Sequence, residues 1–203
     1  MKKTGYNIIQ FSLSQELKHG MMVSILAGEL AGKAGLSKEQ CHELAIAGVL
    51  HDIGKLEMAK YVYQKGQKPL TIEEIKYVRL HPTLGYAITS QNQYSEFIIE
   101  SILYHHENYD GSGFPSNLKE EEIPIGARIL RICDVFSALI SDRPYRRAFP
   151  WEKAIVIMID EIKNFDLKLF LCFMEIIHDE QVCKRVLACK QMKWDLEEEI
   201  LWQ

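Results

Sequence analysis

Apolar positions recur along nearly the whole chain at the three- and four-residue spacing of amphipathic helices. Two stretches interrupt the pattern. Residues 57–70 hold several turn formers and predict a loop or lid, and residues 108–122, with two glycines and a proline, predict an irregular segment. No strand-like alternation stands out. The pattern predicts an all-α fold with helices over residues 13–34, 37–53, 95–106, 126–140, 151–163, 167–178 and 180–203, and with a further helix that begins at residue 71 and includes His81.

Local signals mark several of these helix ends. Ser37 with Gln40 and Thr71 with Glu74 have the spacing of capping boxes at helix N-termini. Gly54 suits the left-handed position that follows a helix C-terminus. We therefore expect one helix to begin after Ser37 and end near residue 53, and the next to begin at Thr71.

Composition limits the classes of partner. The 203 residues fit one domain, and a formal net charge of −4 argues against binding to nucleic-acid polymers, which needs a basic surface. The charge leaves room for one small anionic ligand held by a few local arginines. No apolar run approaches the ~20 residues of a membrane-spanning helix, so we expect a cytoplasmic protein with no membrane segment. The five cysteines form no C-x-x-C pair, which argues against a disulfide framework or a zinc knuckle.

Histidines and aspartates lie within the predicted helices or at their ends, and neutral imidazoles and carboxylates bind iron, manganese and zinc. The candidates are His19, His51, Asp52, His81, His105, His106 and Asp134. Taken singly, a histidine here also fits a structural role in the core or at a helix C-terminus, where its charge would favour the helix dipole. Their recurrence around the His-Asp pair favours a shared metal site.

Asp134 lies in the apolar stretch 129–136, where a carboxylate is unfavourable unless it is paired or binds a metal. One interpretation is an ion pair with Arg131, three residues earlier on the same helix, which adds only ~0.2–0.5 kcal/mol if it is exposed. The other interpretation is a metal ligand, and the apolar surroundings favour it.

Together these residues form a recognisable series of motifs. In chain order they are His19, His51-Asp52-Ile53-Gly54-Lys55, His81-Pro82, His105-His106-Glu107, Gly111-x-Gly113-Phe114-Pro115, Asp134 and Arg143-Pro144-Tyr145-Arg146. The series resembles the HD-GYP subgroup of HD-domain phosphohydrolases, and the resemblance covers residues 13–178. The resemblance implies an HD-domain helical bundle with extra C-terminal helices, which hydrolyses cyclic di-GMP with a bound iron or manganese centre.

The resemblance also implies a role for each matching residue. One metal would be held by His19, His51, Asp52 and Asp134, and Asp52 would bridge to a second metal held by His81, His105 and His106. Asp52 and Lys55 would be catalytic, with Lys55 near the reacting phosphate. The nucleotide would lie beside Gly113, Phe114 and Pro115, and its phosphates would contact Arg143 and Arg146.

Two departures from the subgroup bear on the site. Phe114 stands where the signature loop has tyrosine, so a hydroxyl contact is lost while the packing of the ring survives. Members with a third metal carry an acidic residue four positions before the first histidine, and Gln15 stands there in this chain. Glutamine is a much poorer ligand, so we expect two metal ions. Iron and manganese accept the same ligands, and both stay open.

The expected function is hydrolysis of cyclic di-GMP to pGpG, GMP or both. Two metals ~3.5–4 Å apart would bind a bridging hydroxide for in-line attack and hold the phosphoryl oxygens. Lys55 would stabilise the developing negative charge. Two alternatives stay open: hydrolysis of another cyclic dinucleotide, and a catalytically idle receptor for cyclic di-GMP or a protein partner. Such receptors would be expected to lose metal ligands that this chain retains.

The expected organisation is a lead-in over residues 1–12, a catalytic domain over residues 13–178 and a helical tail over residues 179–203. Apolar residues such as Val182, Val186 and Trp194 alternate with charges in the tail. They predict a helix that packs on the core of its own domain, with a homodimer contact or a partner contact as the alternative.

Overall fold

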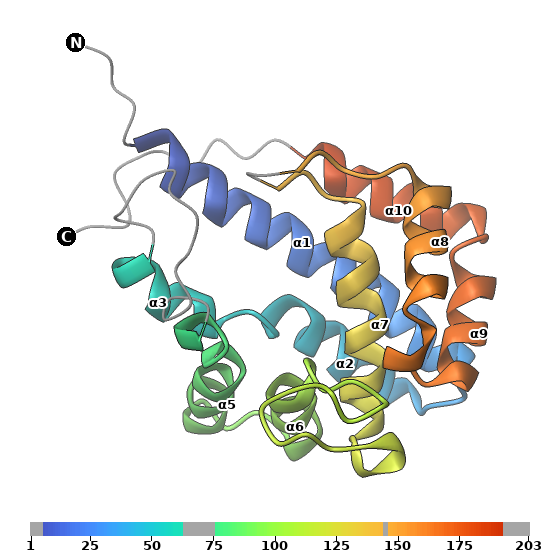
Figure 1. Cartoon of the computed structure of the whole chain (residues 1–203), viewed down its shortest axis with the longest axis horizontal. Helices are drawn as coiled ribbons and strands as arrows, with labels where there is room; N and C mark the ends of the chain where they lie inside the picture. The colour runs from blue at the N-terminus through green and yellow to red at the C-terminus, as the bar shows by residue number, and fades with distance from the viewer. Residues whose placement is uncertain (1–5, 63–75, 144–145, 193–203) are drawn as a thin grey trace.

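The computed structural model describes residues 6–62, 76–143 and 146–192, and the regular elements in these ranges are helices (Figure 1). The α-helices are α1 (Tyr6–Lys33), α2 (Lys38–Leu50), α3 (Gly54–Val62), α5 (His81–Gln91), α6 (Glu96–Tyr104), α7 (Ile125–Leu139), α8 (Trp151–Asp160), α9 (Leu167–Ile176) and α10 (Glu180–Gln191). Two short 3₁₀ helices, η2 (Glu120–Glu122) and η3 (Ile162–Asn164), lie in the connections. The all-α class predicted from the sequence is confirmed.

Helix α1 runs across the molecule and contacts α2, α7, α9 and α10 (Figure 1). Its apolar face includes Val23, Leu26 and Leu30, which are fully buried. These side chains share one core with Leu44 of α2 and Phe136 of α7. Burying a side chain of this size contributes about 1.5–3 kcal/mol, so the long first helix holds the other elements around it.

The first two helices cross closely enough to bring their histidines together. Gly48 of α2 lies against α1, where a Cβ atom at this position would stand 2.7 Å from the backbone of Ser24. Glycine therefore allows a helix separation that any side chain would prevent. His19 of α1 and His51, which directly follows α2, lie near this crossing, and their ring centroids are 5.1 Å apart.

Helix α1 begins earlier than predicted, at Tyr6 instead of residue 13. Residues 6–12 include polar side chains but neither proline nor glycine, so the sequence contains nothing that would end the helix there. The start of α2 is confirmed, because Ser37 and Gln40 exchange the two hydrogen bonds of a capping box. The helix itself ends at Leu50, three residues short of the prediction.

Gly54 does not have the predicted role. It opens α3 and does not adopt the left-handed conformation. The position requires glycine because a Cβ atom there would stand 2.1 Å from the carbonyl oxygen of His81. Helix α3 also occupies the beginning of the predicted loop or lid. The rest of that stretch, and the predicted cap at Thr71 and Glu74, lie outside the described residues.

His81 opens α5, whereas the pattern predicts that it lies within a helix that begins at residue 71. Pro82 explains the difference: it has no N–H group to continue a preceding helix, but its fixed φ suits the first turn of a new one. His81 is therefore held at a helix N-terminus, and its side chain is 2% exposed.

The later helices are confirmed, with ends that differ by a few residues. Ser95, the first residue of the predicted helix, is the N-cap of α6. Helix α10 packs on α1 and buries Val182, Val186 and Cys189, while residues 193–203 of the predicted tail lie outside the described part. Among the helices described, none combines the length and the apolar character that crossing a membrane requires.

Candidate metal centre

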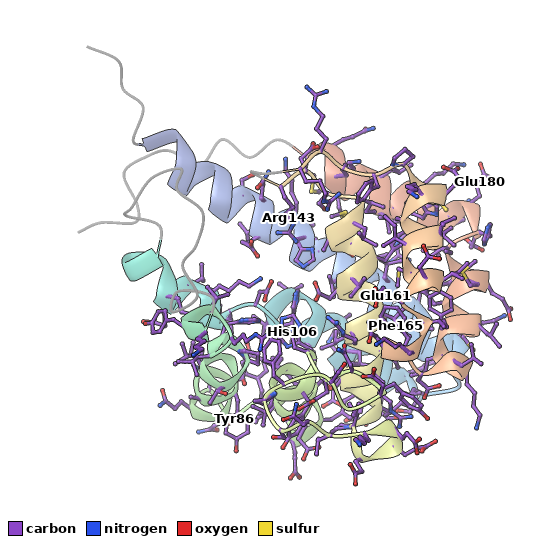
Figure 2. The ribbon with its side chains drawn as sticks, viewed as in Figure 1. Tyr86, His106, Arg143, Glu161, Phe165 and Glu180 are labelled. Carbon is purple, nitrogen blue, oxygen red and sulfur yellow. The ribbon has the colours of Figure 1, made fainter. Side chains whose placement is uncertain are left out.

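Separate segments bring seven histidine and aspartate side chains to one interior site. The contributing elements are α1 (His19), the turn after α2 (His51 and Asp52), the start of α5 (His81), the end of α6 (His105 and His106) and the middle of α7 (Asp134). In Figure 2, His106 lies in the interior between α5, α6 and α7. The structure thus gathers all seven candidate ligands into two neighbouring groups.

The first cluster consists of His19, His51 and Asp134. Nε2 of His19 lies 2.9 Å from Oδ1 of Asp134, and Nε2 of His51 lies 3.8 Å from the same oxygen. Asp134 therefore faces α1 and the turn after α2. Among the described residues it forms no ion pair with Arg131, so the intrahelical pair considered from the sequence does not explain its burial.

The second cluster consists of Asp52, His81, His105 and His106. Nε2 of His81 lies 3.1 Å from Oδ1 of Asp52, and it is 3.3 Å from Nε2 of His105 and 3.1 Å from Nε2 of His106. Four potential ligand atoms therefore point into one small volume.

Asp52 connects the two clusters. Its Oδ2 lies 3.2 Å from Nε2 of His51 in the first cluster, and its Oδ1 lies 3.1 Å from Nε2 of His81 in the second. The two oxygens of one carboxylate thus face different groups of imidazoles, which is the arrangement that a ligand shared between two ions requires.

Backbone carbonyl groups orient three of the imidazoles. Nδ1 of His51 donates to the carbonyl oxygen three residues earlier at 2.8 Å, and His81 and His105 make the same contact at 2.7 and 2.6 Å. In the neutral form of each ring, donation from Nδ1 leaves a lone pair on Nε2, and this second contact is typical of histidines that bind metals.

Unpartnered buried atoms support a metal at this site. Nε2 of His51 and Oδ1 of Asp52 are buried and have no hydrogen-bond partner. Such atoms are rare in folded proteins, because leaving them unsatisfied is unfavourable. A donor set of five imidazoles and two carboxylates suits divalent transition metals. The residues therefore fit the ions that the sequence predicts.

The charges in the site depend on one another. Burial alone would raise the pKa of Asp52, but Lys55 and His51 hold it well below its usual value. Burial would lower the pKa of His51, but the carboxylate of Asp52 outweighs it and raises that pKa to about 9. In the second cluster, burial and neighbouring imidazoles hold the pKa of His105 well below its usual value, and burial lowers that of His106 to about 3. These two imidazoles are neutral, as ligands must be.

Lys55 lies directly beside the clusters. Its Nζ is 2.5 Å from Oδ2 of Asp52 and 3.8 Å from Oε2 of Glu16, and Oε1 of Glu16 accepts a hydrogen bond from Arg143 at 3.5 Å. Glu16 was not among the site residues predicted from the sequence. Its spacing of three residues from His19 could have indicated it, since residues so spaced share a helix face.

Arg143 lies beside α1 (Figure 2) and borders a pocket of about 180 Å³. His19 of the first cluster and two further cations, Lys18 and Lys190, also line this pocket, together with one carboxylate, Asp142, so the charged groups of the lining are mostly positive. The pocket therefore joins a candidate metal ligand to a positively charged wall, which suits an anionic ligand.

The loop with the Gly-Phe-Pro sequence folds against the second cluster. The ring of Phe114 stacks on His106 with 4.8 Å between centroids, and the guanidinium group of Arg79 lies over the same ring at 5.2 Å. Glu107, which is buried, accepts a hydrogen bond from the backbone N–H of Ser116 at 2.6 Å. These contacts fix the phenylalanine at the edge of the cluster.

Gly113 and Pro115 flank that ring. A Cβ atom at Gly113 would stand 2.3 Å from the backbone nitrogen of Asn108, so the close approach of the loop to the end of α6 requires glycine. Pro115 is exposed beside the cluster.

Arg146 takes a different place from the predicted one. Its guanidinium group donates to the carbonyl oxygens of Ala138 and Leu139, at 2.9 and 3.1 Å, and lies 4.4 Å from the ring centroid of Phe149. It therefore caps the C-terminal end of α7. The sequence could not show this, because Arg146 and the end of α7 meet only in the folded structure.

Comparisons with known proteins agree with this architecture. A family model described as "HD domain" matches residues 3–169. The chain is 41% identical over 135 residues to the cyclic di-GMP phosphodiesterase response regulator RpfG of Xanthomonas campestris, which covers 66% of this chain and 35% of that protein. It is 32% identical over 157 residues to the 3′3′-cGAMP-specific phosphodiesterase 1 of Vibrio cholerae, and this match covers 77% of this chain and 36% of that protein. The chain thus spans about a third of the length of these relatives.

A solved structure shows the same fold. Bd1817, an HDG"Y"P protein from Bdellovibrio bacteriovorus, matches with a TM-score of 0.66 and 22% identity. The match covers 82% of this chain and 53% of that one.

Proposed function

This chain belongs to the HD domain family, and we propose that it is a metal-dependent phosphodiesterase that hydrolyses cyclic di-GMP. An HD domain binds divalent metal, and the two clusters could hold it. The observation that carries the proposal is Asp52, whose two oxygens face histidines of different clusters. Two adjacent divalent ions are a recurring device for cleaving phosphate esters. The relative at 41% identity is named a cyclic di-GMP phosphodiesterase, which supports this substrate.

The metal would be iron or manganese, because both accept a mixture of imidazole and carboxylate ligands. The first cluster with Asp52 would hold one ion, and the second cluster would hold the other. When bound, the ions would supply a nucleophile from water at neutral pH and neutralise charge on the phosphoryl group.

The residues around the clusters would bind and orient the phosphodiester. Burial lowers the pKa of Lys55, but Asp52 and Glu16 outweigh it and raise the pKa above its usual value, so the amine stays charged. Its ammonium group would stabilise the negative charge that develops on a phosphoryl oxygen. Arg143, in the cationic wall of the pocket, would bind the other phosphate of a cyclic dinucleotide.

The loop beside the second cluster would recognise a base. Phe114 is half-buried against His106 and has no hydroxyl group, so it would pack on a purine ring without a hydrogen bond. The products would be pGpG, GMP or both, depending on whether the linear product is cleaved again.

A second substrate has a specific observation in its favour. The relative that is named a 3′3′-cGAMP-specific phosphodiesterase is 32% identical to this chain over 77% of its length, a coverage similar to that of cyclic di-GMP phosphodiesterases. Cyclic GMP-AMP presents the same two phosphates with one adenine in place of guanine, so the same metal site would serve both.

The experiment measures hydrolysis of cyclic di-GMP and 3′3′-cGAMP by the purified chain loaded with iron or manganese. We expect about two metal ions per chain, a higher kcat/KM for cyclic di-GMP, and loss of turnover in Asp52→Ala. Asp160→Ala, which removes an exposed carboxylate at the end of α8, is the matched control and should retain activity. A fully loaded chain that binds cyclic di-GMP without cleaving it would be a receptor, and the proposal would fail.

A further inference from the structure

His106 is held differently from three of the other imidazoles in the site. His51, His81 and His105 each direct Nδ1 at a backbone carbonyl oxygen. Nδ1 of His106 faces Nη1 of Arg131 on α7, at 3.5 Å. The group behind this candidate ligand is therefore a cation and not a carbonyl oxygen.

Arg131 is half-buried and has no acidic partner in the part of the chain that the structure describes. Its Nε donates to Oδ1 of Asn108 at 3.0 Å, and Nδ2 of Asn108 donates in turn to Oγ of Ser112 at 2.9 Å. These bonds fix the guanidinium group between α7 and the loop. Burial lowers the pKa of Arg131 from its usual value, although Asp134 opposes the change, and the group remains a cation.

The direction of the hydrogen bonds follows from the chemistry of arginine. A guanidinium group has no acceptor, so Nδ1 of His106 must accept. The neutral imidazole then carries its hydrogen on Nε2, which lies 3.1 Å from Nε2 of His81. Nε2 of His81 can accept this hydrogen bond, because Nδ1 of His81 carries the hydrogen of that ring and donates to the carbonyl oxygen of Val78. His106 thus presents an N–H group to the cluster, whereas His81 and His105 present lone pairs.

We propose that Arg131 makes the second cluster the weaker of the two metal positions. The inference rests on the proposed two-metal site. To bind an ion through Nε2, the neutral His106 must carry its hydrogen on Nδ1 instead of Nε2. The Nδ1–H group would then face the guanidinium group of Arg131, which is positively charged and has no acceptor. The same charge repels a divalent ion nearby. A carbonyl oxygen or carboxylate behind the ring, the usual partner of a metal-binding histidine, has the opposite effect.

The experiment titrates Mn²⁺ into the chelator-treated, dialysed chain and follows free Mn²⁺ by electron paramagnetic resonance. The unaltered chain should bind one ion tightly and a second at least about 10-fold more weakly. Arg131→Met has a similar length and no charge, so it should tighten the weaker phase by about 10-fold and leave the tighter phase unchanged. Arg131→Lys keeps the charge and should keep the second phase weak.

Arg79→Met is the matched control. It removes a positive charge that lies over Phe114 and contacts no ligand nitrogen, so its isotherm should match that of the unaltered chain. Circular dichroism establishes that each variant is folded, and Arg131→Gln replaces Arg131→Met if the latter is not. Two equal phases in the unaltered chain, or no tightening when the charge is removed, would overturn the inference. The proposed function fails separately, if the chain with both ions bound cleaves no cyclic dinucleotide.

Discussion

At the scale of single residues, His51 and Asp52 are buried together, and each keeps its charge only because the other is charged. Each would lose its charge if it were buried alone, because desolvation disfavours the charged form of both groups. Their proximity reverses this effect for both. In the metal-free chain the imidazolium group compensates the carboxylates of Asp52 and Asp134, and a divalent ion would take over that role when it binds.

This charge pairing predicts a pH dependence for the metal-free chain. The pKa of folded His51, about 9, lies above its ordinary value of 6.5. The stabilisation is therefore complete below pH 6.5 and is lost as the pH rises from 6.5 through 9. The free energy of unfolding, measured with urea in the presence of a chelator, should fall by up to about 3 kcal/mol over this range.

Two histidine variants separate this effect from the general response of the protein to pH. His51→Gln should unfold with a nearly constant free energy between pH 6.5 and 9. His178→Gln changes an exposed histidine after α9 and should keep the full decrease. The same decrease in both variants would assign the pH dependence to other groups.

At the scale of helices, the crossing of α1 and α2 determines whether the first cluster forms. Gly48→Ala would place a Cβ atom 2.7 Å from the backbone of Ser24, so the helices must separate. We expect a loss of about 1–3 kcal/mol in the free energy of unfolding, together with weaker binding of metal. Urea denaturation and metal analysis measure the two effects.

Gly32→Ala is the matched control on α1. Its Cβ atom would stand 3.7 Å from Sγ of Cys41, which is an ordinary contact. Alanine in a helix interior is favoured over glycine by about 0.5–1 kcal/mol, so this variant should be as stable as the original chain or more so. If Gly48→Ala were equally stable, the close crossing would not be required for the fold.

The sequence predicts an element well where the signal is local and poorly where it depends on another element. The side chain of Ser37 caps its own helix, and that start is confirmed. The role of Gly54 depends on contact with His81, which no local pattern contains. The candidate ligands could be found because histidines, and aspartates in apolar stretches, are residue types that commonly bind metals. Glu16 could have been found by its spacing from His19, but its contact with Arg143 and the contacts of Arg146 could not, since they join segments that meet only after folding.

At the scale of the whole molecule, α10 shares the core that supports the site. Val186 is fully buried in that core, while Leu187 beside it is 42% exposed. Val186→Asp would bury an unpaired charge and should lower the free energy of unfolding by about 3 kcal/mol or more. Leu187→Asp should change it by no more than about 0.5 kcal/mol. Equal effects in thermal melts would mean that α10 unfolds independently of the domain.

The candidate metal ligands come from α1, the turn after α2, α5, α6 and α7. Bound ions would therefore link these elements to one another, in addition to the side-chain packing between them. An ion that binds only the folded chain stabilises it by about 2.7 kcal/mol at a concentration 100 times its dissociation constant. Mn²⁺ should therefore raise the melting temperature of the chelator-treated chain. Asp52→Asn should lose most of this increase, because Asp52 serves both clusters, whereas Asp160→Asn should retain it. An equal increase in both variants would place the metal outside these clusters and contradict the two-metal site.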